Sequence, residues 1–215
     1  MSKKKVTIID YGLGNLFSIK RALEVSGASE VEISSSSEVI SKADRLILPG
    51  VGAFANGMSG LRSKGLVDVI LDYANSERPL LGICLGMQML TTVSEEFGEH
   101  EGLNLIPGRV KPIPRSGVEG QLIKVPNVGW HSLQSDNYHS WTDTILCGIT
   151  PRNYVYFVHS YQVETILPSD SLSFTLYGGH KISAVIKRNN IYGCQFHPEK
   201  SGEIGLKILS QFISA

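Results

Sequence analysis

The sequence contains few cysteines and no excess of charge of either sign. Its 215 residues include three cysteines, Cys84, Cys147 and Cys194, and none stands in a C-x-x-C pair with zinc or redox spacing. Three cysteines cannot all be paired in disulfides, so this composition predicts a reducing compartment, the cytoplasm. The 20 basic and 20 acidic side chains give a formal net charge of +0, which argues against nucleic acid as a partner.

Long hydrophobic runs are also missing. The most apolar stretch, residues 79–90, is interrupted by Gly82, Gly86 and Gln88, and it is shorter than the roughly 20 residues that span a membrane. The N-terminus has only a four-residue apolar run at 6–9, so it lacks the pattern of a secretory signal. With 42% hydrophobic and 19% charged residues, the chain can bury a core of its own. We therefore expect a single domain over residues 1–215, with no membrane partner.

The order of apolar segments predicts an α/β fold. The first half alternates short apolar runs with amphipathic stretches, which is typical of a mostly parallel, doubly wound sheet. Strands are expected at 6–10, 31–33, 45–48, 79–83 and 191–196, and helices at 16–26, 37–42, 58–73, 85–93 and 204–212. Between residues 109 and 186, short β-like segments separated by turn residues predict antiparallel strands added to the same sheet.

The segment Gly82-Ile83-Cys84-Leu85-Gly86 has the G-x-nucleophile-x-G spacing of a nucleophile elbow. The turn from strand to helix is so tight there that side chains two residues before and after the nucleophile would collide. Cys84 would lie at a helix N-terminus, where unpaired amides favour the thiolate over the thiol. The amide of Leu85 would be able to donate to an oxyanion. A structural cysteine buried on a core strand is the alternative, and it leaves the flanking glycines unexplained.

A cysteine nucleophile requires a base, and the sequence offers one after the last expected strand. Phe196-His197-Pro198-Glu199 would begin at the carboxyl end of that strand, where open α/β sheets have their sites. Together with Cys84, these residues would form a triad in which His197 transfers the proton and Glu199 fixes its tautomer. A lone histidine is more often structural, so this interpretation depends on the elbow.

Two glycine-rich segments resemble nucleotide-binding motifs without matching them. Residues 49–54, Pro-Gly-Val-Gly-Ala-Phe, lack the Gly-Lys-Ser/Thr ending of a P-loop. Beside a cysteine elbow, this loop is better suited to turn a backbone amide toward a reacting carbonyl. Residues 10–15 begin like a dinucleotide fingerprint, but Phe17 occupies the position of its third glycine. We therefore expect neither a phosphate site nor a dinucleotide cofactor.

In combination, these motifs resemble a known family. GICLGMQ at 82–88, PGVGAF at 49–54 and FHPEKS at 196–201 resemble the class I, triad-type glutamine amidotransferases, whose glutaminase domain passes ammonia to a synthase. DYGLGN at 10–15 and YFVHSY at 156–161 are similar to the glutaminase subunit of imidazole glycerol phosphate synthase, from histidine biosynthesis. The resemblance extends from about residue 6 to the end of the chain. It implies a flavodoxin-like α/β fold.

The resemblance also implies roles for individual residues. Cys84 would attack the carboxamide of glutamine, His197 would protonate the departing ammonia, and Glu199 would orient His197. The amides that would stabilise the oxyanion belong to Val51, Gly52 and Leu85. The residues that would hold glutamine are Gly52, Gln88, Glu96, His159, Ser160 and Tyr161. For Glu96, a solvated glutamate beside Glu95 is an equally good interpretation of the sequence alone.

The implied partner is a (β/α)8-barrel cyclase. In such a heterodimer the ammonia would pass through the barrel, where the cyclase makes imidazole glycerol phosphate and AICAR. Asn15 and Lys200 flank the catalytic end and are candidate partner contacts, although they could equally be ordinary surface residues. The resemblance implies no cofactor and no metal.

One segment departs from the family pattern. Residues 126–131, Pro-Asn-Val-Gly-Trp-His, replace the usual Pro-His-x-Gly-Trp-Asn, so the histidine and the asparagine have changed places. This departure affects the prediction of which protein accepts the ammonia more than the prediction of glutaminase chemistry. The alternative is a paralogous subunit that supplies ammonia to a sugar amidotransferase for acetamidino sugars of surface polysaccharide. A stand-alone cysteine peptidase or amidase, and a binding module with an inactive site, are the other hypotheses.

Overall fold

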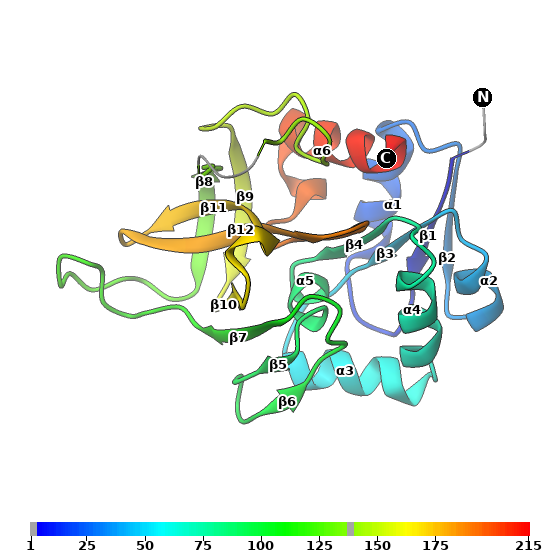
Figure 1. The fold of residues 1–215 in the computed structure, drawn as a ribbon, viewed down its shortest axis with the longest axis horizontal. Helices are drawn as coiled ribbons and strands as arrows, with labels where there is room; N and C mark the ends of the chain where they lie inside the picture. Colours follow the sequence, from blue (N-terminus) through cyan, green and yellow to red (C-terminus); the bar gives the residue numbers. More distant parts are fainter. Residues whose placement is uncertain (1–3, 137–139) are drawn as a thin grey trace.

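A seven-stranded sheet forms the centre of the computed structural model, which describes residues 4–136 and 140–215 (Figure 1). In spatial order, its strands are β11 (Ser171–Tyr177), β12 (His180–Arg188), β13 (Ile191–Cys194), β4 (Leu80–Ile83), β3 (Arg45–Leu48), β1 (Lys5–Ile9) and β2 (Glu30–Ser34). The five strands from β13 to β2 run parallel, whereas β11 and β12 are antiparallel to their neighbours. The predicted α/β fold with a mostly parallel sheet is therefore confirmed.

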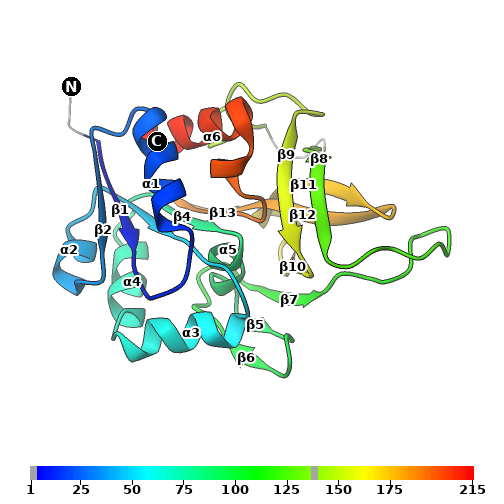
Figure 2. The same cartoon turned by 180° about the vertical axis from the view of Figure 1, so that it is seen from behind.

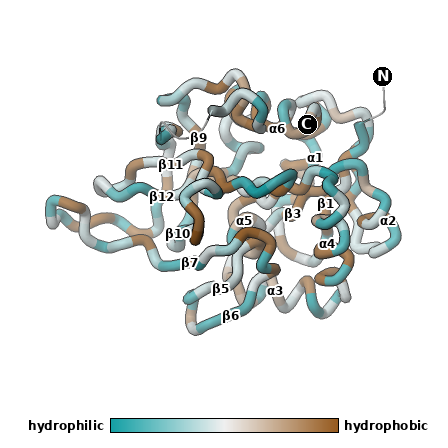
Figure 3. Tube along the Cα trace, viewed as in Figure 1, coloured by the Kyte–Doolittle hydropathy of each residue, from teal (hydrophilic) through white to brown (hydrophobic). Residues whose placement is uncertain are grey.

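Helices cover both faces of this sheet (Figures 1 and 2). One face carries α1 (Leu16–Val25) and α6 (Gly202–Ser214), and their apolar sides share a core with Val6 and Ile8. The other face carries α2 (Ser37–Ser41), α3 (Phe54–Ser63), α4 (Val67–Ala74) and α5 (Leu85–Met89), which share a second core with Ile9 and Leu48. Because both faces are covered, the parallel strands are apolar along nearly their whole length. Figure 3 shows hydrophobic segments running through the middle of the molecule.

The second half of the chain differs from the sequence-based expectation. Only β11 and β12 join the main sheet as antiparallel strands. A separate four-stranded sheet consists of β10 (Tyr161–Thr165), β7 (Gly108–Pro112), β5 (Val93–Ser94) and β6 (His100–Glu101), and a two-stranded one of β8 (Asn127–Ser132) and β9 (Tyr154–His159). The prediction that all these strands extend one sheet was wrong, because alternation predicts a strand but not its pairing partner.

Two predicted helices also have different lengths. The single helical region expected at 58–73 consists of α3 and α4, which are separated near Gly65, where φ is +64°. The helix expected at 85–93 ends at Met89. Thr91, Thr92 and Val93 follow it, and such β-branched residues favour extended backbone, so the chain turns into β5.

The parallel strands direct their carboxyl ends toward one edge of the sheet. The segments that follow β1, β3, β4 and β13 contain the four motifs at 10–15, 49–54, 82–88 and 196–201. Such an edge is where open α/β sheets place their binding sites. Within residues 4–136 and 140–215, no helix combines the length and the apolar character needed to cross a membrane.

Candidate active site

A cavity of about 360 Å³ opens at this edge of the sheet and contains most of the predicted site residues. Pro126 and Val158, which the sequence did not suggest, also line it. Of the predicted residues, Glu199 and Asn15 are outside the lining. The predicted residues that line it are Val51, Gly52, Cys84, Leu85, Gln88, Glu96, His159, Ser160, Tyr161, His197 and Lys200.

Cys84 occupies a strained turn between β4 and α5. Its φ of 54° and ψ of −110° are unusual for a residue with a side chain. A Cβ atom at Gly82 would lie 2.6 Å from the carbonyl oxygen of Gly86, and one at Gly86 would overlap the carbonyl oxygen of Leu48. The collision predicted from the spacing therefore occurs, and the nucleophile elbow is confirmed as a local structure. The backbone of this turn therefore determines the position of Cys84.

His197 lies between Cys84 and Glu199. Its side chain lines the same cavity as Cys84, and its Nδ1 lies 2.8 Å from Oε1 of Glu199. The His197 residue is 3% exposed, and the Glu199 side chain is 1% exposed. Burial by itself lowers the pKa of His197, but the hydrogen bonds and charges of Cys84 and Glu199 outweigh it and raise the pKa to about 9. This raised pKa favours an imidazolium at neutral pH.

The backbone of His197 is anchored to a second strand pair. Its amide donates to the carbonyl of Tyr156 on β9 at 3.0 Å, and Ser201 Oγ donates to the His197 carbonyl at 2.7 Å. The short helix η2 (Pro198–Lys200) follows directly, with proline in its first turn. This turn brings Glu199 back under the imidazole, which explains why two residues so close in sequence can form a hydrogen bond. Glu199 therefore contacts His197 from behind and does not face the cavity.

The loop after β3 packs against the elbow. A Cβ atom at Gly50 would lie 2.8 Å from Cβ of Leu85 and 2.9 Å from the amide nitrogen of Gly86, so only glycine fits this approach. Gly52 has a φ of +92°, which glycine adopts without strain. The hydroxyl of Tyr11, from the 10–15 segment, donates to the carbonyl of Pro49 at 2.7 Å. Sequence reasoning missed this contact, because nothing in the sequence indicates which loop Tyr11 reaches.

Gln88 connects the cavity to a second glutamine that the sequence did not suggest. Nε2 of Gln88 donates to the carbonyl of Tyr161 at 3.2 Å and to Oε1 of Gln195 at 3.0 Å. Because a carbonyl can only accept, the amide orientation of Gln88 is fixed, and its oxygen is the polar group left for the cavity. Gln195 is fully buried, and its Nε2 lies 3.9 Å from Sγ of Cys84. Its position directly before Phe-His-Pro-Glu was the only available signal.

The family model for class-I glutamine amidotransferases matches residues 7–215, the part of the chain that contains all of these motifs. The chain belongs to the class-I glutamine amidotransferase family. The expectation of a glutamine amidotransferase is thereby confirmed.

Individual relatives agree with this family membership. The protein named imidazole glycerol phosphate synthase subunit HisH 1 from Legionella pneumophila (strain Paris) is 53% identical over 209 residues, which cover 97% of this chain and 98% of that protein. The HisH subunit from Syntrophotalea carbinolica is 44% identical over 210 residues, covering 96% and 98%. The resemblance to the imidazole glycerol phosphate synthase subunit is therefore confirmed.

Solved structures share the fold. A glutamine amidotransferase crystal structure superposes with a TM-score of 0.70 at 15% identity and covers 98% of this chain and 99% of that one. PurLQS from Thermotoga maritima superposes with a TM-score of 0.70 at 18% identity, covering 99% and 98%. These superpositions establish the class-I amidotransferase fold. Because the sequence identities are so low, they do not identify the substrate of this chain.

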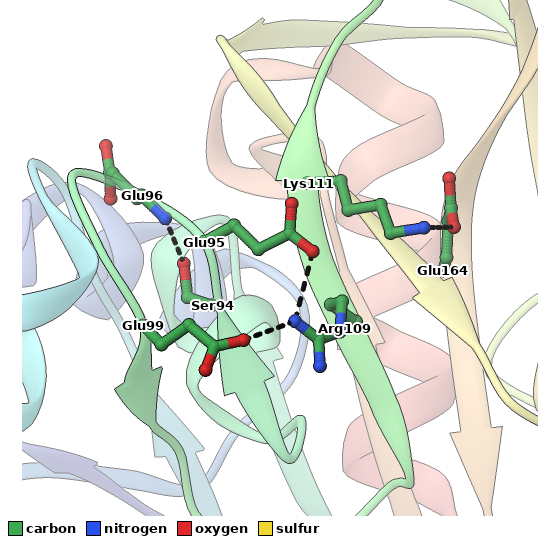
Figure 4. Close-up of polar contacts among 7 residues, drawn as sticks. All are labelled: Ser94, Glu95, Glu96, Glu99, Arg109, Lys111 and Glu164. Atoms are coloured by element: carbon green, nitrogen blue, oxygen red, sulfur yellow. Dashed lines mark hydrogen bonds and ion pairs between the residues drawn. The ribbon is translucent and has the colours of Figure 1, made fainter.

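Glu96, on the far side of the amidotransferase cavity, differs clearly from its neighbour Glu95. Figure 4 shows the Glu96 carboxylate pointing away from the ion-pair cluster in which Arg109 joins Glu95 and Glu99. Oε2 of Glu96 instead accepts the amide of Phe54, the first residue of α3, at 2.6 Å. Glu96 therefore lines the cavity and caps a helix, so the interpretation as a merely solvated glutamate was wrong.

His159 is almost completely enclosed. It is 6% exposed, and burial lowers its pKa to about 4, so the ring is neutral at physiological pH. Its Nδ1 lies 2.8 Å from the carbonyl of Tyr161, and its Nε2 lies 3.1 Å from Nδ2 of Asn127. Both ring nitrogens are thus engaged by the protein. His159 lines the cavity as expected, but its ring has no nitrogen free for a substrate.

The two candidate partner contacts lie in different places. Lys200 is exposed and lines the cavity. Asn15 is exposed at the start of α1, makes no side-chain cap there, and lies outside the cavity lining. Among the residues that the structure describes, no three His, Cys, Asp or Glu side chains are grouped so as to hold a metal ion. Of the other cysteines, Cys194 is buried on β13, and its burial raises the pKa of its thiol.

Proposed function

We propose that residues 1–215 form one glutaminase domain that hydrolyses glutamine to glutamate and ammonia through Cys84, His197 and Glu199. The observation that carries this proposal is that Cys84 and His197 line one cavity while Glu199 is hydrogen-bonded to His197. Cys84 is the nucleophile, because it stands on a strained elbow at the start of a helix. His197 is the acid and base, and Glu199 is the group that orients it.

The first half of the reaction forms a thioester. Sγ of Cys84 attacks the carboxamide carbon, and His197 donates its proton to the amide nitrogen, which departs as ammonia. The raised pKa of His197 supports this role, since the proton is in place before the attack. In the second half, water attacks the thioester carbon and passes a proton to His197. Cys84 leaves as the thiolate, and glutamate is released.

The tetrahedral intermediate carries a negative charge on the former carboxamide oxygen. We assign its stabilisation to the amide of Leu85, at the start of α5, and to an amide of the Val51–Gly52 segment. The close contact of Gly50 with Leu85 supports this pairing, because it brings the two backbone segments together. Loss of one such donor typically costs about 100- to 1,000-fold in rate.

Glutamine specificity follows from the groups around Cys84. Gln88 presents an amide oxygen, which can accept a hydrogen bond from the substrate. Glu96 presents a carboxylate, which suits the α-ammonium group of glutamine. Gly52, Ser160 and Tyr161 complete the substrate-binding set, and His159 supports it from behind.

We further assign the ammonia to a partner subunit. The names of the relatives, subunits of imidazole glycerol phosphate synthase, support such a partner. We take it to be a (β/α)8-barrel cyclase that makes imidazole glycerol phosphate and AICAR, and we place the complex in the cytoplasm. Large apolar side chains are exposed on the surface: Val51, which lines the cavity, is 40% exposed, Phe17 82% and Trp130 51%. Such side chains are typical of a docking surface. Asn15 and Lys200 would contact the same partner.

Co-purification of the chain with the cyclase tests the whole assignment. We expect glutamate release to depend on the cyclase, and Cys84→Ala to lower it by roughly 1,000-fold or more while product formation from added ammonium salt continues. Unchanged glutaminase activity in Cys84→Ala would refute the triad. Activation by a sugar amidotransferase, with none by the cyclase, would refute the histidine-pathway acceptor and support the paralogous function.

A further inference from the structure

Strand β8 carries a polar pair that faces inward. Asn127 and His131 lie four residues apart, so they share one face of the strand, and Asn127 is fully buried. Val128 and Trp130, on the other face, are 54% and 51% exposed. The imidazole of His131 packs between the rings of Phe157 and Tyr177, with centroid distances of 5.8 and 5.3 Å. Asn127 and His131 are the two residues whose order departs from the family pattern.

The hydrogen bonds of this pair have only one consistent direction. The carbonyl of Tyr161 can only accept, so Nδ1 of His159 must carry the hydrogen of their 2.8 Å contact. In a neutral ring, Nε2 of His159 is then an acceptor, and it receives the bond from Nδ2 of Asn127 at 3.1 Å. The oxygen of Asn127 therefore faces His131, whose Nε2 donates to it at 2.6 Å.

The same set of contacts continues to the nucleophile. The Tyr161 carbonyl, where the bonds from β8 end, also accepts from Gln88. Gln88 donates to Gln195, whose amide lies 3.9 Å from Sγ of Cys84. A side chain on β8 is thus connected through buried polar groups to both the proposed substrate-binding glutamine and the reacting sulfur.

We propose that Asn127 and His131 are positioning residues for the glutamine pocket, which hold His159 in the tautomer with hydrogen on Nδ1 and thereby fix the Tyr161 carbonyl against Gln88. This inference rests on the proposed glutaminase function for its kinetic consequences. Neither residue touches the substrate, since neither lines the cavity. They act through His159, whose two nitrogens are both used in this way.

The exchanged order of the two residues is consistent with this role. A histidine at position 127 and an asparagine at position 131 would also form the chain, because the asparagine amide would donate to one ring nitrogen of that histidine and its other ring nitrogen would donate to His159. The exchange conserves the combined volume of the pair, whereas either single substitution changes it. The direction of the hydrogen bonds toward Tyr161 is the same in both orders.

The kinetic test compares two single variants with their double exchange in the complex. We expect Asn127→His and His131→Asn each to raise KM for glutamine about tenfold, and the double variant to return it to within about twofold of the wild type. Parallel thermal unfolding separates this effect from folding, since a merely structural role would lower Tm without changing KM below the transition. A double variant no better than the poorer single variant would overturn the proposal.

The spectroscopic test needs no glutaminase activity. Imidazole ¹⁵N NMR of the wild-type chain should show hydrogen on Nδ1 and none on Nε2 of His159, unchanged between about pH 6 and about pH 8. Hydrogen on Nε2, or a titration near its ordinary pKa of about 6.5, would overturn the inference even if the chain proves to be a glutaminase. The reverse result, the expected tautomer in an inactive protein, would refute only the proposed function.

Asn127→Asp sharpens this test, because a carboxylate cannot donate to His159. We expect the variant to hold His159 in its doubly protonated form. The pH dependence of kcat/KM should then shift, because a charged His159 interacts electrostatically with His131 and His197. Asn104→Asp is the matched control: Asn104 is exposed and uses only its oxygen, which accepts from Thr92 at 2.7 Å. An unprotonated His159 in Asn127→Asp would contradict the assigned direction.

Discussion

The cavity has two walls that are held in place by different means. The sheet wall consists of Cys84, Leu85 and His197, which follow β4 and β13. The outer wall consists of Glu96, His159, Ser160 and Tyr161, which belong to the small sheets and their connections. Backbone collisions and strand ends fix the sheet wall, whereas side-chain hydrogen bonds fix the outer wall. Substitutions should therefore damage the two walls in different ways.

The largest effect is expected when a methyl side chain is added at Gly86, in the elbow that carries the sheet wall. Gly86→Ala should lower the free energy of unfolding by about 3 kcal/mol or more and remove nearly all glutaminase activity, because its Cβ would overlap the Leu48 carbonyl and displace Cys84. Chemical denaturation and glutamate release measure both quantities. Gly27→Ala is the control, since Gly27 has open space around it and the variant incurs only the strain of a φ of +101°, about 1–2 kcal/mol. Equal effects of the two variants would contradict a specific backbone constraint at the elbow.

Glu199→Gln tests the part of the sheet wall that depends on charge. We expect a loss of about 100-fold or more at pH 7, because a neutral amide can hold His197 in the wrong tautomer. Removal of the carboxylate should also lower the pKa of His197 from about 9. Since the reaction needs protonated His197, the alkaline limb of kcat/KM should move to lower pH.

The free energy of unfolding should also decrease with rising pH, because of the raised pKa of His197. The folded-state pKa of His197 is raised above its usual 6.5, so its contribution is fully present below pH 6.5 and is lost as the pH rises through 9. In Glu199→Gln the folded-state pKa is lower, so this loss should be smaller and should be complete at a lower pH. Glu203→Gln, an exposed position in the first turn of α6, is the control. An unchanged alkaline limb in Glu199→Gln would show that Glu199 does not set the His197 pKa.

On the outer wall, Glu96→Gln should separate two roles of one side chain. The amide oxygen can still accept from Phe54, so Tm should change little, but loss of the charge should raise KM for glutamine about tenfold or more. Glu95→Gln removes a charge next to it that pairs with Arg109, and it should leave KM unchanged (Figure 4). A fall in Tm without a change in KM would mean that Glu96 only caps α3.

The difference between the walls also explains which parts could be predicted from the sequence. Gly82 and Cys84 follow a local rule, because a Cβ at Gly82 would collide with Gly86, four residues away. His197 and Glu199 follow a strand end, whereas the collision of Gly86 with Leu48 joins distant residues. The lengths of α3 to α5 were predicted incorrectly. The division into three sheets was also missed, because strand pairing depends on distant partners. The links of Asn127 to His159 and of Gln88 to Gln195 span 32 and 107 residues, and no spacing rule reaches that far.

The smallest effect tests a side-chain contact of the loop that packs against the sheet wall, the bond from Tyr11 to Pro49. Tyr11→Phe removes the hydrogen bond to Pro49 and leaves that buried carbonyl unpaired, which should cost about 1–2 kcal/mol of stability. The loop that contains Val51 and Gly52 would then be less well fixed, so kcat should fall by about threefold to tenfold, with KM unchanged.

A matched control for Tyr11→Phe exists at the other end of the parallel strands, before the amino end of β4. The hydroxyl of Tyr73 donates to the carbonyl of Pro79 at 3.1 Å, and Tyr73 is as buried as Tyr11 but far from the cavity lining. Tyr73→Phe should therefore lower stability by a similar amount and leave kcat unchanged. If both variants lose kcat equally, the effect of Tyr11 is global, and the oxyanion loop is fixed by its glycine contacts alone. If only Tyr11→Phe loses kcat, the loop beside the sheet wall depends on one side-chain hydrogen bond for its final placement.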